Sequence, residues 1–453
     1  MARSETLTAP AAALPGRLSG VTDATLADLA ARAGEPAFLA ERRARAWAFV
    51  QKTPFPSRIE ELWRRTDISG LDWETLRVLS DPHPMARTAS DLPTELGAEI
   101  GPASERSALV VTLDRDVVLL ERDPALARTG VVVAPFAEAA RDHADLLSRL
   151  IGASIRFDES RFTGLNAALR SPGILVHVPA GVHVEKPIRV LIARETPDLA
   201  IFPHTIVALE KGARATVIEE YVSVGEPGTP VVVPVTEITV GDEADLHLAT
   251  LNHWGGNVRH FGVERARIGR EGRFHWTFAG LGGKLVKSDM EIHLEGEGAE
   301  GKFSGCYFGS ESQHFDFHTF QNHVVGHTTS DLLFKGALRG RARTIYQGLI
   351  RVHKNAQRSD AYQANRNLIL SDKARADSIP SLEIEANDVR CTHGATVGQV
   401  DEEQLFYLMA RGLARPDAER LIIAGFFEPV LERIPSETLR ALVTAAIDAK
   451  AGR

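Results

Sequence analysis

In the stretch GARATV (residues 212–217), a glycine precedes a core-type residue by five positions, and the pattern returns in GDEADL (241–246), GREGRF (269–274) and GAEGKF (298–303). Gly326 continues the glycine series in steps of 29, 28, 29 and 28 residues, although Asp331 then stands where an apolar residue is expected. A constant period of this length indicates stacked coils, because one coil cannot bury its apolar face alone. We therefore predict a mainly β protein with a right-handed parallel β-helix as its core. A large β-sandwich with accidental spacing is the alternative.

Residues 166–400 form the predicted β-helix core, because short β-type runs replace helical periodicity there. Gly, Asp, Asn and Lys turns separate these runs. The runs are Ile174–Val178, Ile188–Ile192, Thr216–Ile218, Val231–Val233, Leu246–Leu251, Phe274–Phe278, Leu349–Val352 and Leu368–Leu370.

Residues 21–165 predict a helical and mixed domain that follows a flexible tail at residues 1–20. Asp23 is a candidate N-cap, Gly34 ends the first helix and Pro36 opens the next. The expected elements are two helices within Thr22–Val50, a short helix around Glu60–Arg64, strands Ala108–Leu113 and Val117–Leu120, and a helix Phe136–Leu150.

Helical periodicity returns in residues 401–453, which we predict to be a C-terminal helical domain. Asp401 precedes the first helix, Pro416 opens a second that Gly425 ends, and Ser436 is a candidate N-cap for a third. We expect this compact end to cover the last coil of the solenoid, because that coil otherwise exposes unpaired strand edges.

The composition limits the class of protein. A formal net charge of −8 lacks the basic footprint of a nucleic-acid-binding protein. No apolar stretch is long enough to span a membrane, and the first twenty residues lack the apolar region of a secretory signal. Nothing in the sequence pairs the two cysteines, Cys306 and Cys391. The expected compartment is the cytoplasm, where thiols stay reduced.

Two nucleotide-binding motifs match the segment 296–302 only superficially. Its glycines fit both G-x-G-x-x-G and most of a P-loop, but Phe303 takes the place of the Ser or Thr that holds Mg²⁺. Both motifs also need a following helix, whereas the next residues predict a strand. No hydrolase or zinc-protease motif is present either. We therefore expect no nucleotide site, no catalytic residue and no enzymatic activity.

A histidine run comprises His314, His318, His323 and His327. In a strand, its first two histidines alternate with Phe315 and Phe317 and therefore face away from them. We expect a solvated or interface surface here. The alternative is a metal site, since imidazole is the commonest protein metal ligand, and with it a β-helical metal-binding enzyme.

Cys391 and His393 form a second candidate site. In an extended strand, residues two apart share a face, so a thiolate and an imidazole there can approach one metal ion. Two ligands do not complete a site, so the remaining ligands must come from elsewhere in the chain or from a partner. The alternative is a buried structural cysteine beside a hydrogen-bonded histidine.

Three stretches of the chain carry a family resemblance. They are PFPSRIEELWRRTD (54–67), SDAYQANRNLILSDKARADSIPSLEIEANDVRCTHGATVGQVDEEQLFYLMARGL (359–413) and IIAGFFEPVLERIP (422–435). Together they resemble the SufB/SufD family of iron–sulfur cluster assembly proteins. Asn365 stands where SufB-like chains have a cysteine, and Gly394 stands where they have a glutamate. With Cys391 two residues before the histidine, the chain looks like the SufD branch.

The resemblance implies a scaffold subunit that pairs core to core with SufB and recruits the SufC ATPase through the C-terminal helices. A nascent iron–sulfur cluster is then expected at the interface with SufB, with His393 as a candidate ligand and Cys391 beside it, and no tightly bound cofactor in the isolated chain. A role that only supports SufB and recruits SufC is a further alternative. Self-association of the isolated chain through the partner face is also expected to be possible.

The expected SufC-contact residues are Phe426, Phe427, Glu428 and Pro429. They follow Gly425 in a predicted turn between two helices. The two aromatic residues fit an ordinary core equally well.

Overall fold

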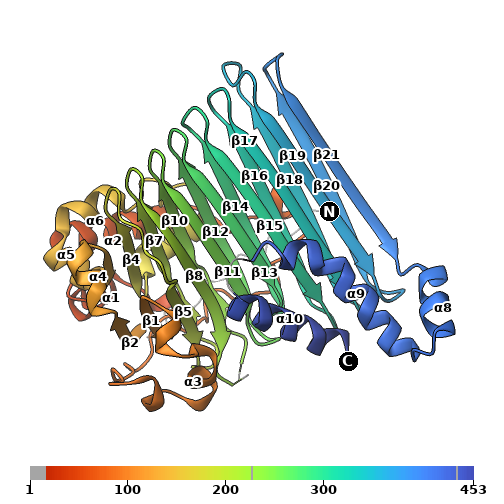
Figure 1. Ribbon diagram of the computed structural model, residues 1–453. Helices are drawn as coiled ribbons and strands as arrows, with labels where there is room; N and C mark the ends of the chain where they lie inside the picture. The colour runs from red at the N-terminus through yellow and green to blue at the C-terminus, as the bar shows by residue number, and fades with distance from the viewer. Residues whose placement is uncertain (1–16, 226–227, 435–436, 453) are drawn as a thin grey trace, which may run out of the picture.

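The computed structural model describes residues 17–225, 228–434 and 437–452. Two long sheets face each other and form a β-solenoid, which confirms the predicted mainly β, parallel coil architecture (Figure 1). The right-handed sense of the coils stays a prediction. In the described residues one sheet has the order β2-β1-β5-β8-β11-β13-β15-β17-β19-β21 and the other β20-β18-β16-β14-β12-β10-β7-β4-β3, with β6 and β9 beside it.

The strands of the first sheet are β1 (Ala108–Leu113), β2 (Asp116–Arg122), β5 (Ile188–Arg194), β8 (Arg214–Ser223), β11 (Asp245–His253), β13 (Arg273–Gly280), β15 (Glu300–Gly309), β17 (Thr329–Leu338), β19 (Asp360–Ile369) and β21 (Arg390–Gln399). The strands of the second sheet are β3 (Val132–Pro135), β4 (Gly173–Val178), β6 (Ala200–Ile201), β7 (His204–Leu209), β9 (Val231–Val232), β10 (Val235–Val240), β12 (Arg259–Ile268), β14 (Leu285–Leu294), β16 (His314–His323), β18 (Arg343–Val352) and β20 (Arg375–Ile384). The predicted runs fall on these strands, but many strands were missed because charged residues alternate along them.

One left-handed residue begins a turn in each coil, and this column is the structural repeat. Its members are Gly181, Gly212, Glu243, Glu271, Gly298, His327 and Arg358, with φ between 53° and 74°. Along the column, the backbone N–H of one member donates to the carbonyl of the residue before the next member, as Gly212 does to Asp242 at 2.8 Å. Such φ values favour glycine, yet four of the seven carry side chains.

The predicted repeat therefore had the correct period but the wrong alignment. Val217 pairs with Leu248, not Leu246, and Leu332 takes the core position of the fifth copy, not Asp331. Asp331 instead faces outward and lies 3.3 Å from Arg433. A shift of two residues keeps a side chain on the same face of a strand, so spacing alone could not detect the error.

The N-terminal region covers the start of the solenoid and one outer face. Strands β1, β2 and β3 join the two sheets directly, and β1 matches its predicted range. The helices are α1 (Asp23–Arg32), α2 (Ala37–Val50), α3 (Thr94–Ile100), α4 (Pro124–Thr129), α5 (Phe136–Asp142), α6 (Ala144–Leu150) and α7 (Arg161–Leu169), with 3₁₀ turns at Leu18–Gly20, Glu61–Trp63, Ala89–Asp91 and Ala103–Glu105.

Two local N-terminal predictions were wrong. Thr22, not Asp23, is the N-cap of α1, because its hydroxyl accepts the Thr25 N–H at 3.3 Å and leaves Asp23 as the first helical residue. The single helix expected at 136–150 is divided at His143, whose ψ of 43° leaves the helical region. Leu18, at the end of the predicted tail, is buried and bonds to Leu76; residues 1–16 lie outside the described residues.

The C-terminal helices are α8 (Glu402–Ala410), α9 (Arg415–Leu431) and α10 (Glu437–Ala451). Helices α9 and α10 lie across the outer face of the first sheet, where Ile423, Val443 and Ile447 pack on Phe308 and Leu333 (Figure 1). The expectation that this end covers the last coil was wrong. The outer-facing apolar side chains of β15, β17 and β19 offer α9 and α10 more surface to bury than the rim of one coil does. The proposed cap Ser436 lies outside the described residues.

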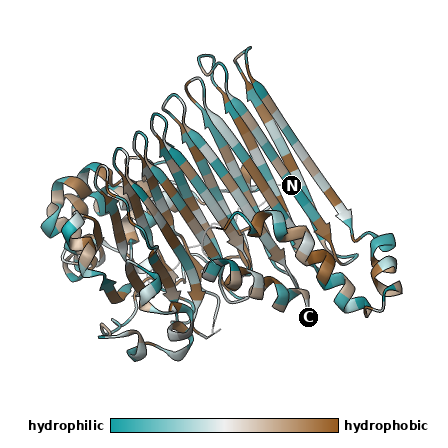
Figure 2. Cartoon of the chain, viewed as in Figure 1, coloured by the Kyte–Doolittle hydropathy of each residue, from teal (hydrophilic) through white to brown (hydrophobic). Residues whose placement is uncertain are grey.

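The last coil, β20 and β21, is the exposed end of the solenoid. These strands terminate the two sheets, and Val397 on β21 is 49% exposed. Figure 2 shows apolar colour concentrated in the early coils and mixed colours in the strands of the last ones. The described chain therefore leaves one set of strand edges without a neighbouring strand.

Candidate functional site

Cys391 and His393 lie on β21 and face the solenoid interior. Their register neighbours on β19 are Ala361 and Gln363, so the prediction that the two side chains share one face is confirmed. His393 is exposed at the open end, whereas Cys391 is half-buried and packs beside a small apolar cluster that includes Ile350. The site is thus open to a partner molecule along the solenoid axis.

The Cys391 thiol is a neutral group in this environment. Burial raises its pKa above the usual value, and the nearby Asp360 carboxylate raises it further. A thiol must lose its proton to bind a metal. Cys391 therefore becomes a ligand only when a metal ion or a cationic partner group approaches it.

A polar layer lies directly under the open end. Asn365 Nδ2 donates to the Tyr307 hydroxyl at 3.1 Å, and Ser378 Oγ donates to Asn365 Oδ1 at 2.7 Å. Asn367 completes the layer by donating to Asn365 Oδ1, also at 2.7 Å. These buried groups satisfy one another, so Asn365 is a structural hydrogen-bonding residue in this chain. The sequence signalled the layer only as scattered polar residues in β-type runs.

The histidine run does not form a metal site. Its predicted alternation is confirmed, since Phe315 and Phe317 are in the core and His318 faces outward. His323, in contrast, points inward and bonds to Thr328 and Ser330, and His327 occupies an exposed turn. Among the described residues, no three His, Cys, Asp or Glu side chains are grouped so as to hold a metal ion.

The outward face of the histidine run is also not solvated, so that expectation was wrong. The N-terminal segment around residues 62–66 packs over it. Thr66 Oγ1 donates to Asp316 at 2.5 Å, and Lys287 Nζ donates to the Leu62 carbonyl at 3.0 Å. The segment that covers the histidines is more than 200 residues away in sequence, so local periodicity could not reveal it.

The covered histidine face is a coupled charge cluster. Burial disfavours the charged form of Asp316, but the hydrogen bond with His318 and the charge of Lys287 outweigh it and hold the pKa of that carboxyl well below its usual value. Burial likewise opposes the charge on His318, but contacts with Asp289 and Asp316 raise its pKa. The cluster therefore fastens the N-terminal segment to the sheet and is closed to substrates.

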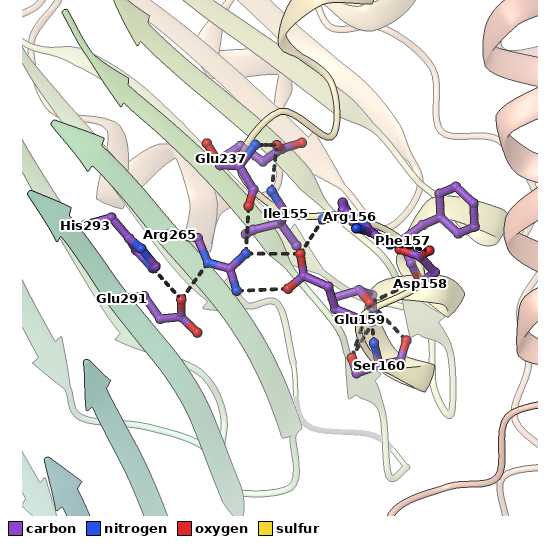
Figure 3. A network of polar contacts seen from close by, with 12 residues as sticks. Ile155, Arg156, Phe157, Asp158, Glu159, Ser160, Glu237, Arg265, Glu291 and His293 are labelled. Carbon is purple, nitrogen blue, oxygen red and sulfur yellow. Dashed lines mark hydrogen bonds and ion pairs between the residues drawn. The ribbon is translucent and has the colours of Figure 1, made fainter. Parts of the chain in front are cut away.

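A second polar network fastens the loop at residues 152–160 to the same sheet (Figure 3). Arg265 bridges Glu159 and Glu291, with shortest distances of 2.9 and 2.6 Å. Glu237 accepts the backbone N–H groups of Gly152 at 2.7 Å and Ser154 at 2.8 Å. Every charge in this network has a partner within the protein, so it too is structural.

The four expected SufC-contact residues do not form a turn. Helix α9 continues through them, because Ile423, Phe427 and Val430 share one face that packs on the sheet. Phe427 is fully buried near Phe308, which favours the ordinary-core interpretation for this residue. Phe426 is half-buried and its carbonyl accepts from Lys335, while Glu428 and Pro429 are exposed.

An exposed apolar surface on α8 was missed by sequence reasoning. It consists of Phe406, Tyr407, Met409, Leu413 and Leu421, of which Phe406 is 74% exposed. We call it the α8 surface. Only Leu405 of this helix is buried. The available signal was the run LFYLM, which is apolar on all sides of a helix and not along one stripe.

Two family models match the chain. The model described as "SUF system FeS cluster assembly, SufBD core domain" matches residues 191–426, and "SufBD protein N-terminal region" matches residues 106–190. The iron–sulfur cluster assembly protein SufD of Bacillus subtilis is 29% identical over 418 residues, which cover 92% of this chain and 94% of that protein. An iron–sulfur cluster assembly SufBD family protein of Staphylococcus epidermidis is 25% identical over 92% of this chain and 90% of its own length. No helix in the described ranges is long and apolar enough to cross a membrane.

Proposed function

Because the chain belongs to the SufBD family of the SUF iron–sulfur cluster assembly system, we propose that it is a scaffold subunit that presents a nascent cluster site at its open end. The observation that carries the proposal is the placement of His393 and Cys391 on the last, uncovered strand. Two ligands on one strand edge leave room for ligands from a second chain. The cluster is the cargo of this site and not a resident cofactor.

The second chain is a SufB-type subunit that docks against the last coil. Strand β21 has a partner on one side only, so the backbone groups of its outer edge are free to pair with a strand of another protein. Val397 and Ile384, both exposed, add apolar surface on the same coil. The edge would bring the partner's ligands within reach of His393. A second copy of this chain would use the same edge in the absence of that partner.

The α8 surface is the proposed dock for a SufC-type ATPase. A row of exposed aromatic and aliphatic side chains on a helix suits a groove on a partner protein. Helix α8 follows β21 directly, so a protein bound there lies next to the cluster site. The chain has no P-loop of its own, so nucleotide hydrolysis would come from the partner. This assignment replaces Phe427, which is buried, and keeps exposed Glu428 and Pro429 as possible rim contacts.

Co-purification tests the proposal. The chain is expressed with the SufB-type and SufC-type proteins of its own organism, and subunits, iron and sulfide are measured. A stable three-protein complex is expected with the unaltered chain. His393→Ala is expected to keep the complex and lose most of the iron and sulfide, while His183→Ala, an exposed histidine at the other end of the solenoid, changes neither.

Two results would contradict parts of the proposal. Full iron and sulfide with His393→Ala would reduce the role to support of the partner and recruitment of the ATPase. Absence of any complex would remove the scaffold role altogether.

A further inference from the structure

Gln363 is a fully buried amide with no hydrogen-bond partner. Its exposed fraction is 0%, and neither Nε2 nor Oε1 has a partner in the structure. An unpaired buried amide costs about 1–3 kcal/mol, and most buried polar groups avoid this cost. The residue therefore calls for an explanation beyond packing.

The chain makes room for this amide on the opposite sheet. The side chain of Gln363 reaches from β19 across the interior to Gly348 on β18, where a Cβ atom would lie 2.4 Å from Nε2. Gly348 thus accommodates the amide in a way that no other residue would. Below Gln363 in register lies Leu332, which offers no polar group.

The polar side chain next to Gln363 toward the open end is His393. The two are register partners on adjacent parallel strands, about 4.8 Å apart, and both face the interior. His393 is exposed, so its ring turns at little cost. A histidine that binds a metal through one nitrogen almost always donates its other N–H to an oxygen acceptor, which fixes the tautomer.

We propose that Gln363 is the positioning residue for His393, with its Oε1 accepting the imidazole N–H that is not used for iron. This inference deepens the proposed function, since it assigns to His393 the second contact that an iron ligand needs. The hydrogen bond forms when the ring turns toward the interior, which frees the other nitrogen lone pair toward the open end. Gln363 touches neither iron nor sulfide in this arrangement.

The test measures the tautomer of His393 in the isolated full chain, by ¹⁵N NMR with labelled histidine and His393→Ala to assign the signals. One dominant tautomer is expected in the unaltered chain. Gln363→Met keeps the length of the side chain without an acceptor and should give a mixture of tautomers. Gln363→Glu restores an acceptor and should restore the single tautomer. Gly348→Ala, which displaces the amide, should resemble Gln363→Met.

The matched control is Gln321→Met, since Gln321 is another buried interior glutamine but bonds to Ser330 and has no register contact with His393. It should leave the tautomer unchanged. A second arm measures iron in the three-protein complex, where Gln363→Met is expected to retain about 10–100-fold less iron at limiting concentration.

The two arms separate the two proposals. An unchanged tautomer in folded Gln363→Met overturns the role of Gln363, whether or not clusters form. A complex of the unaltered chain that takes up no iron and sulfide contradicts the proposed function, and the tautomer arm still decides the role of Gln363. If Gln363→Met fails to fold, Gln363→Glu and Gly348→Ala give opposite expected results and decide it.

Discussion

Lys287 Nζ lies 3.1 Å from Asp316 Oδ2 on the neighbouring strand, and their side chains are 2% and 0% exposed. The same ammonium donates to the carbonyl of Leu62 and lies 4.8 Å from the centre of the Trp63 ring. One buried ion pair therefore connects the outer face of the solenoid to the N-terminal segment. Its charges have been removed from water, so removal of one partner leaves the other buried without compensation.

Replacement of Lys287 by Met is expected to reduce the free energy of unfolding by about 3–5 kcal/mol, because the Asp316 carboxylate stays buried. Denaturant unfolding measures the effect. Lys284→Met is the matched control, since Lys284 is partly exposed and donates only to the Ser312 hydroxyl; its change should stay within about 0.5 kcal/mol. Equal effects for the two variants would show that the buried pair adds nothing.

The His318 charge predicts a loss of stability toward alkaline pH. Because its pKa in the folded chain is raised above 6.5, its contribution is complete below about pH 6.5 and disappears as pH rises through the folded value. Asp316 has a lowered pKa, so its contribution is present above pH 3.8 and disappears as pH falls through the folded value. In His318→Gln, unfolding measured at a series of pH values should lose the alkaline slope and keep the acid one.

Two fully buried glutamates predict opposite results when changed to Gln. Burial, together with Glu219, raises the pKa of Glu264 well above 4.5, and neither of its oxygens has a partner. Its stabilising contribution is complete below pH 4.5 and falls as pH rises toward the folded value. Glu264→Gln should therefore increase stability at pH 7 by up to about 3 kcal/mol.

The matched variant Glu237→Gln should be destabilising. Glu237 is equally buried, but hydrogen bonds with His204 and with backbone N–H groups hold its pKa below the usual value despite burial. Loss of these charge-assisted hydrogen bonds is expected to cost about 1.5–3 kcal/mol at pH 7. Calorimetric unfolding of the two variants at pH 5 and pH 7 distinguishes them, and the same sign for both would contradict the assignment.

The two thiols should differ in reactivity. Burial raises the pKa of Cys306 to about 12, and Cys306 is enclosed between the first sheet and α9. Cys391 is half-buried at the open end and its pKa is raised less far. A maleimide should label Cys391 alone in the folded chain, faster at pH 9 than at pH 7. Mass spectrometry should show no labelling of Cys391→Ser, and protection of the thiol when the SufB-type partner is bound.

The α8 surface should be needed for ATPase binding only. Phe406→Glu is expected to weaken binding of the SufC-type protein at least about tenfold and leave pairing with the SufB-type protein unchanged. Ile59→Glu, at another strongly exposed apolar residue, is the control and should affect neither. Pull-down with titrated ATPase measures both. A normal affinity for Phe406→Glu would move the dock elsewhere on the C-terminal helices.

Residues that act through local geometry could be read from the sequence. The coil period near 29 residues determined the stacked parallel architecture, because the same turn recurs in each coil. The two-residue period of a strand placed Cys391 and His393 on one face, and Phe315 and Phe317 on the face opposite His318. The family motifs at the C-terminal end of the core indicated the SufBD family, and the family models match there.

Tertiary structure alone decided what covers each face. The sequence could not show that residues 62–66 close over His318, that Phe427 packs near Phe308, or that the α8 surface stays exposed. It could not fix the alignment of the coils either, since a shift of two residues changes no face. The physical reason is the same in each case. Local periodicity states which side of an element is apolar, whereas burial depends on segments 100 or more residues away, which only the folded chain brings together.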